Sequence, residues 1–177
     1  MILILLNIFL KMTSDNNINI RTGMGFDAHR LISDIPLLIG GVQIPYEKGL
    51  HGHSDGDVLI HSIIDALLGA ANLGDIGKYF PSKDTNLKGI DSTIMLKTIM
   101  DKINNHKWQI NFIDTTIIAE KPQLSEFINN IKKSLSNAMN IPEHLISVKA
   151  KTTDGMGFIG KSEGIAALSV ATVQQNK

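Results

Sequence analysis

Polar and apolar residues alternate over residues 18–24, where every second side chain is Ile, Ile, Thr and then Met. A period of two is typical of a half-buried β-strand. The pattern continues through residues 25–30, so the strand is predicted to reach Asp27 and His29. In extended backbone these two side chains point to the same face, because they are two positions apart.

Other segments have the composition of strands. The last of them, residues 164–173, is small, apolar and nearly unbroken, which predicts a strand buried on both faces. The others are residues 37–39 and 42–44, which flank a Gly40-Gly41 hairpin turn, residues 108–119, and residues 146–150.

Three segments show helical spacing of apolar residues. The first is predicted to be capped by Ser54 or Asp55 and to end at Gly74. The second spans Ser92 to His106 and the third Leu124 to Met139. The irregular order of strands and helices predicts an α+β fold: a single two-layer domain over residues 18–177, in which helices pack on one face of a mixed β-sheet.

Residues 1–17 are expected to be an N-terminal extension that is disordered or not native. About ten apolar positions precede Lys11, whereas a membrane-spanning helix needs roughly twenty. A signal peptide is the alternative, but the segment has neither a charged beginning nor a small-x-small cleavage site. Met12 is a second possible start. We therefore expect the cytoplasm, or the matrix of an organelle.

The chain has 17 basic and 17 acidic residues, so no net field favours nucleic acid or an anionic membrane as a partner. It has no cysteine, which excludes disulfides and thiolate metal sites and fits a reducing compartment. The strong metal ligands that remain are His, Asp and Glu.

Asp27, His29 and His61 form a candidate metal set of two histidines and one carboxylate. Three protein ligands with one open position are typical of catalytic zinc, although the same set also suits non-haem iron. Asp57, His61 and Asp65 share a helix face, so a carboxylate one turn away is expected to hold the His61 ring. The alternatives are a solvated Asp-His pair at a strand end and a polar helix face in solvent. His106 and His144 are expected at the surface.

Groups that suit phosphate surround this set in the sequence. His53 precedes the helix N-terminus, where free N–H groups favour anions. The segment Thr152-Thr153-Asp154 offers hydroxyls and an acid for phosphate and a hard cation, and Lys78 or Lys83 adds a positive charge. Asp75, flanked by glycines, suits a polyol hydroxyl. Together they indicate metal-assisted phosphoryl chemistry rather than redox iron.

Five motifs in the same order resemble the 2-C-methyl-D-erythritol 2,4-cyclodiphosphate synthase family of the non-mevalonate isoprenoid pathway. The resemblance covers about residues 18–173. The motifs are G-x-G-F-D-x-H-R at 23–30, I-G-G-V-x-I-P at 39–45, H-S-D-G-D-V-x-x-H at 53–61, D-A-L-L-G-A-A-x-L-G-D-I-G-K at 65–78 and T-T-D-x-x-G-F at 152–158.

The resemblance implies a lyase in which the 2-phosphate of 4-diphosphocytidyl-2-C-methyl-D-erythritol 2-phosphate attacks the β-phosphorus and expels CMP. No protein nucleophile is needed. It further implies a homotrimer with active sites between subunits, a small-molecule substrate, and no nucleic-acid or membrane partner.

The resemblance assigns roles to individual residues. Asp27, His29 and His61 correspond to the zinc ligands, and Asp154 to the ligand of a second ion, Mg²⁺ or Mn²⁺. His53 and Thr152 correspond to the groups that stabilise the transition state. The residues it assigns to substrate binding are Asp27, Ala28, His29, His53, Ser54, Asp75, Ile76, Gly77, Phe80, Pro81, Ser82, Lys83, Asp84, Ala119, Glu120, Lys121, Pro122, Gln123, Leu124, Ser125, Lys151, Thr152, Thr153, Asp154, Phe158 and Lys161.

Two positions depart from the family pattern. Gln123 stands where a lysine is usual in the nucleotide loop, and Lys161 where an arginine is usual. Lys161 lacks the planar fork of a guanidinium, so contacts assigned to that arginine are in doubt. Two functions remain as alternatives: a zinc-stabilised interaction domain without catalysis, and a metal-dependent phosphoesterase.

Overall fold

A five-stranded sheet forms one layer of the molecule in the computed structural model, which describes residues 18–176. The expected N-terminal extension, residues 1–17, lies outside the described residues. The strand order is β4-β1-β7-β5-β6; β5 and β6 are parallel and the other neighbours antiparallel, so the predicted mixed sheet is confirmed. The strands are β1 (Ile18–Ser33), β4 (Lys48–His51), β5 (Gln109–Ile118), β6 (Ile146–Lys151) and β7 (Gly164–Asn176).

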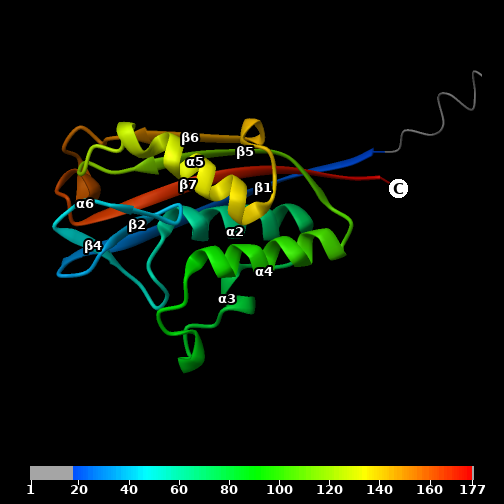
Figure 1. Ribbon diagram of the computed structural model, residues 1–177, viewed down its shortest axis with the longest axis horizontal. Coiled ribbons are helices and arrows are strands. Elements are labelled where there is room, and N and C mark those ends of the chain that lie inside the picture. The colour runs from blue at the N-terminus through cyan, green and yellow to red at the C-terminus, as the bar shows by residue number, and fades with distance from the viewer. Residues whose placement is uncertain (1–17, 177) are drawn as a thin grey trace, which may run out of the picture.

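The helices gather on one side of this sheet, as predicted (Figure 1). Helix α2 lies directly on β1 and β7, α4 packs on α2, and α5 packs on α4 and β6. The helices are α2 (Val58–Ala71), α3 (Ile76–Tyr79), α4 (Ser92–Asn105), α5 (Ile128–Met139) and α6 (Gly157–Gly160). Among the described residues, no helix is long and apolar enough to cross a membrane.

The predicted hairpin is confirmed as β2 (Leu37–Ile39) and β3 (Val42–Ile44), whereas β4 had no clear signal in the sequence. Helix α2 is buried almost all round, and its apolar residues form the centre of the core. Its cap differs from the prediction, because Asp57 rather than Ser54 or Asp55 accepts the N–H of Ile60. The helix ends at Ala71, where Asn72 takes the left-handed conformation with φ 57°.

The face of β1 that α2 covers is the reverse of the one that the alternation suggests. Gly23 and Gly25 are buried against the helix, whereas Met24 is 69% exposed and Phe26 58% exposed on the opposite face. Glycine is required because a Cβ on Gly25 would lie 2.0 Å from the carbonyl oxygen of Ser62. The strand therefore presents backbone to the helix and side chains to the open face.

Two other strands show the same open face. A bulge in β5 between Ile110 and Phe112 changes the phase of the strand, so Ile110 packs toward the core while Phe112 is exposed. Strand β7 was predicted to be buried on both faces. Within one chain this prediction is wrong, because Ile165 is fully buried but Leu168 is 37% exposed. The helices cover only one side of the sheet, which leaves these apolar side chains uncovered.

Candidate metal centre and adjoining cavities

Asp27, His29 and His61 converge where β1 meets α2, so the structure brings the three predicted residues together as a group that could hold a metal ion. Asp27 and His29 point to the helix-covered face of β1, and His61 lies in the first turn of α2. The close approach permitted by Gly25 sets the separation of the two elements, since Gly25 is two residues before Asp27 and contacts the backbone next to His61.

The three ligand atoms lie within hydrogen-bond distance of one another. Asp27 Oδ2 is 2.9 Å from His29 Nε2 and 2.9 Å from His61 Nδ1, and the two nitrogens are 3.2 Å apart. The imidazole rings meet edge to face, at an interplanar angle of 69°. Each ring therefore directs one nitrogen at the same point as the carboxylate.

The other nitrogen of each ring is also held. His29 Nδ1 donates to the carbonyl oxygen of His51 at 2.9 Å, which leaves the Nε2 lone pair free to face the centre. His61 Nε2 lies 2.9 Å from Ser54 Oγ and 3.0 Å from Ser92 Oγ. Such outer partners are typical of metal-ligating histidines, because they fix the ring orientation and tautomer.

The electrostatics of the trio favour a cation. Burial opposes ionisation of Asp27, but the His29 and His61 rings, which donate to it when they are protonated, outweigh burial and hold the pKa of the carboxyl well below its usual range. The hydrogen bond to Asp27 raises the pKa of His29. A carboxylate that stays ionised between two imidazoles attracts either a proton or a metal ion.

The geometry fits zinc. With metal–ligand bonds of about 2.0–2.1 Å, a tetrahedral ion separates neighbouring ligand atoms by about 3.3 Å. The observed separations of 2.9, 2.9 and 3.2 Å differ from this value by only a few tenths of an ångström. Three converging ligands also leave one tetrahedral position for a substrate oxygen.

A cavity of about 210 Å³ opens onto the trio. Its lining also includes His53, Ser54, Ile76 and Phe80, to which the resemblance assigns a role in substrate binding. His53 Nε2 is also 3.1 Å from the carbonyl oxygen of Asp84. The full lining is Asp27, His29, His53, Ser54, His61, Asp65, Ile76, Phe80, Leu87, Ile90 and Met95.

Asp57 and Asp65 do not hold the His61 ring, and the alternative of a polar helix face in solvent is also wrong. Asp57 is fully buried and accepts the N–H groups of Gly40 and Gly41 in addition to that of Ile60. Asp65 accepts the N–H of Ile76 at 2.8 Å. The α2 N-terminus is therefore occupied by the Asp57 side chain, which makes it a poorer anion site than the sequence predicted.

A second and larger cavity, of about 900 Å³, lies at the end of β5 and β6. It is lined by the whole of residues 119–125, which the resemblance assigns to substrate binding, and by Lys151 and Thr152. The sequence did not identify its other lining residues, which are Tyr46, Ile128, Asn129 and Ala150. Within residues 18–176 the two cavities have no lining residue in common, so His53 and Thr152 are not brought together within one chain.

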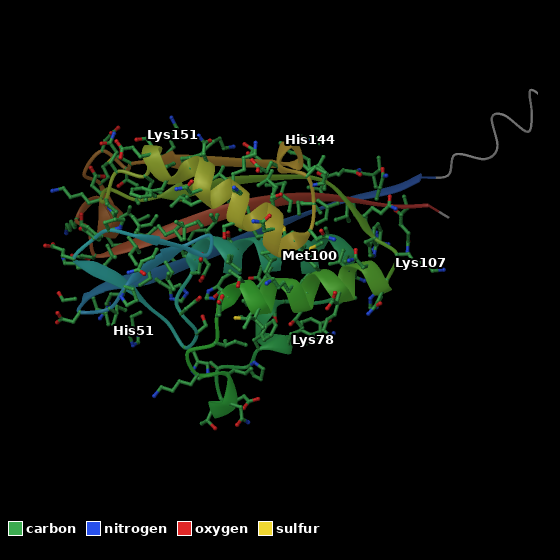
Figure 2. All side chains as sticks on the ribbon, viewed as in Figure 1. His51, Lys78, Met100, Lys107, His144 and Lys151 are labelled. Atoms are coloured by element: carbon green, nitrogen blue, oxygen red, sulfur yellow. The ribbon has the colours of Figure 1, made fainter. Side chains whose placement is uncertain are left out.

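The two cavities lie near different edges of the sheet, and Figure 2 shows a residue at the end of each edge strand. His51 ends β4 and Lys151 ends β6, the two edge strands of the sheet, and both lie at the same end of the molecule. The metal centre is near the first edge and the larger cavity near the second. His144 and His106 are exposed, in agreement with their prediction as surface residues.

The remaining predicted residues lie outside both linings. Asp154 is exposed in the left-handed conformation, φ 51°, and its Oδ1 accepts from Thr152 Oγ1 at 3.2 Å. Asp75 caps α3 by accepting the N–H of Lys78 at 3.0 Å, and Lys78 Nζ donates to the Leu73 carbonyl. The other predicted substrate-binding residues that line neither cavity are mostly or partly exposed. They are Ala28, Gly77, Pro81, Ser82, Lys83, Asp84, Thr153, Phe158 and Lys161.

The fold and the trio define a class: a small α+β domain in which two histidines and one carboxylate, a set that could hold a metal ion, lie beside a cavity. Residues 20–174 match the model of the YgbB family, and the chain belongs to this family. A curated relative from Clostridium botulinum (strain Okra / Type B1), 2-C-methyl-D-erythritol 2,4-cyclodiphosphate synthase, is 50% identical over 150 residues, which are 85% of this chain and 97% of that protein.

Solved structures agree. The IspF (Plasmodium falciparum) CDP complex has a TM-score of 0.78 and 34% identity, over 90% of this chain and 98% of that one. The bifunctional IspDF from Campylobacter jejuni has a TM-score of 0.87 and 42% identity, over 90% of this chain but only 43% of that one. This chain therefore corresponds to slightly less than half of the bifunctional protein.

Proposed function

We propose that the protein is a 2-C-methyl-D-erythritol 2,4-cyclodiphosphate synthase. It converts 4-diphosphocytidyl-2-C-methyl-D-erythritol 2-phosphate to the cyclic diphosphate and CMP, in isoprenoid precursor synthesis. The observation that carries the proposal is the convergence of Asp27, His29 and His61 beside a cavity that contains His53, in a chain 50% identical to a synthase of that name.

The reaction needs positioning and charge stabilisation rather than a protein nucleophile. The attacking 2-phosphate is already an anion, and the leaving CMP carries its own charge. Asp27, His29 and His61 would hold the zinc ion, which would supply a Lewis acid for the phosphates. The His53 ring, which donates from Nε2 to the Asp84 carbonyl, lies in the lining of the same cavity. In its protonated form it can also donate from Nδ1 to the phosphates.

The larger cavity holds the cytidine part of the substrate. Its volume of about 900 Å³ lies in the usual range for small-molecule ligands, and its lining combines apolar residues such as Pro122 and Leu124 with polar ones such as Gln123 and Ser125. Lys151 and Thr152 at its edge contact the diphosphate, and Asp154 binds the accompanying Mg²⁺ or Mn²⁺. A solved relative in complex with CDP supports this assignment.

We propose further that each active site is shared between subunits of a homotrimer, which the position of the two cavities near separate edges of the sheet supports. The open sheet face supports this assembly, because Ile20, Met24 and Phe26 are 60%, 69% and 58% exposed. Monomers rarely leave such an apolar patch uncovered. Light scattering is expected to give three times the chain mass for the wild type, and a monomer for the Ile20→Glu, Met24→Glu double variant, with activity lost. A fully active wild-type monomer would exclude the shared site.

The activity is tested by incubating the purified protein with the diphosphocytidyl substrate and zinc, and following phosphorus by NMR. We expect CMP and one cyclic diphosphate in equal amounts. A linear, hydrolysed product would instead identify a phosphoesterase. A stable fold without turnover, together with unfolding on zinc removal, would identify an interaction domain. The expected cytoplasmic location remains a proposal, which cell fractionation would check.

A further inference from the structure

Outside the ligand trio, two hydroxyls contact the second ring nitrogen of His61. Ser54 Oγ is 2.9 Å from His61 Nε2 and Ser92 Oγ is 3.0 Å from it. Ser92 is fully buried and is the first residue of α4, 31 positions after His61. The chain thus directs a buried side chain from a separate helix at a metal-ligating imidazole.

Ser92 is itself held by Asp55. One carboxylate oxygen of Asp55 accepts the Ser92 hydroxyl and the other accepts the Ser92 N–H at 2.9 Å. The N–H of Asp57 also points at Asp55, at 3.2 Å. With these contacts the carboxylate lies at the joint between the loop before α2 and the start of α4.

The direction of these hydrogen bonds follows from the chemistry of the groups. An ionised carboxylate only accepts, so the Ser92 hydroxyl proton points to Asp55. The Ser92 oxygen then offers a lone pair to His61 Nε2, which must carry the ring proton. When a metal ion replaces the proton between His61 Nδ1 and Asp27, the Nδ1 lone pair is then available as its ligand.

The backbone performs the same task for the other imidazole. A carbonyl oxygen cannot donate, so His51 fixes the proton of His29 on Nδ1 and leaves Nε2 for the metal. Ser54 has no comparable link to a carboxylate, since the contact its Oγ makes besides His61 is the N–H of Gly56 at 3.3 Å. Of the two hydroxyl contacts at His61 Nε2, the one through Ser92 has a fixed direction.

We propose that Asp55 and Ser92 are positioning residues that set the tautomer and orientation of His61 for metal binding. Two backbone hydrogen bonds keep their segments together: Gly89 N–H to the His53 carbonyl at 2.8 Å, and Asp55 N–H to the Ile90 carbonyl at 3.1 Å. The inference rests on the proposed metal site and adds two residues to it.

The test measures zinc affinity directly, by competition with a chromogenic chelator, on wild type and Ser92→Ala. Loss of such an outer partner weakens metal binding by about 10- to 100-fold. We expect an increase of that size in the zinc dissociation constant, and a changed visible spectrum of the cobalt(II)-substituted protein. Ser92→Thr, which keeps the hydroxyl, is expected to restore affinity to within about threefold of wild type.

Thr115→Val is the matched control. Thr115 lies on β5, and its buried hydroxyl makes one hydrogen bond, to the Ser147 carbonyl at 3.0 Å. Its zinc affinity should equal that of the wild type. If Ser92→Ala does not fold, Asp55→Asn decides, since it replaces one acceptor oxygen by a donor and should also weaken zinc binding.

The outcomes separate this inference from the proposed function. Ser92→Ala with wild-type zinc affinity and an unchanged cobalt spectrum would overturn the positioning role, as would an equal loss in Thr115→Val. A wild type that binds no zinc would overturn the metal site itself. A loss in Ser92→Ala that Ser92→Thr restores would support the proposal.

Discussion

Replacing Gly25 by alanine should separate the two halves of the metal centre. The added Cβ would lie 2.0 Å from the Ser62 carbonyl oxygen and 2.7 Å from the Ala66 nitrogen, whereas real Cβ contacts stay above 3.0 Å. Both atoms belong to helix backbone and cannot rotate away, so α2 must move by about 1 Å. Asp27 Oδ2 and His61 Nδ1 are only 2.9 Å apart, and metal–ligand bond lengths tolerate changes of about 0.2 Å. The movement of α2 should therefore lower zinc affinity by at least about tenfold.

The expected loss of stability is also limited in size. Overpacking of this kind costs about 1–3 kcal/mol, against a total of about 5–15 kcal/mol for a typical domain, so the variant should stay folded. A misplacement of about 1 Å at reacting groups can lower the rate about 100-fold. Urea denaturation, chelator competition and the phosphorus NMR assay measure the three effects.

Gly69→Ala provides the control on the same helix. A Cβ there would meet only the Gly23 Cα, at 4.0 Å, which is ordinary contact. Alanine inside a helix is more favourable than glycine by about 1 kcal/mol, so this variant should be more stable and bind zinc normally. Wild-type zinc affinity in Gly25→Ala would refute the argument that the β1–α2 contact sets the metal geometry.

Three further predictions concern single side chains. His61→Ala should abolish zinc retention and turnover while the circular dichroism spectrum stays folded; full activity would contradict the metal assignment. Asp57→Ala should cost about 3 kcal/mol or more in urea denaturation, because three buried backbone N–H groups lose their acceptor; a loss below about 1 kcal/mol would show that water replaces it. Gln123→Lys should tighten CDP binding a few-fold in calorimetry at low salt, and the gain should shrink as salt screens the added charge; a gain that persists at high salt would point to a different contact.

The elements could be predicted from the sequence because their signals are local. Helix α4 is an example: Met95, Leu96, Ile99 and Met100 recur at helical spacing, and all are buried as predicted. The hairpin β2–β3 was likewise identified from its Gly-Gly turn. Spacing in extended backbone correctly placed Asp27 and His29 on one face.

The faces of the strands could not be predicted in the same way. In β1 the apolar residues of the alternation are the exposed ones, and the glycines between them are buried. Burial there is decided by the backbone of α2, which needs positions without side chains, and hydrophobic patterning counts only side chains. The bulge that separates Ile110 from Phe112 in β5 has no pattern of its own either.

The outer partners of the metal ligands were missed for a related reason. Ser92 reaches His61 from another helix and His51 acts through its carbonyl oxygen, so neither leaves a motif around the ligands. Asp57 was predicted to contact the His61 ring, because its i, i+4 spacing on the helix permits that contact. Burial at the helix N-terminus instead gives its carboxylate to three backbone donors.

These placements change how the segment His51 to His61 should be understood. Its three histidines have three different relations to one site: the His61 ring belongs to the trio that could hold a metal ion, the His53 ring lines the cavity, and the His51 carbonyl oxygen accepts from His29. The geometry of the metal centre is therefore a property of β1, α2 and α4 within one chain. The larger cavity depends on β5 and β6 at the other edge, so an isolated subunit should bind zinc normally even when it cannot turn over substrate.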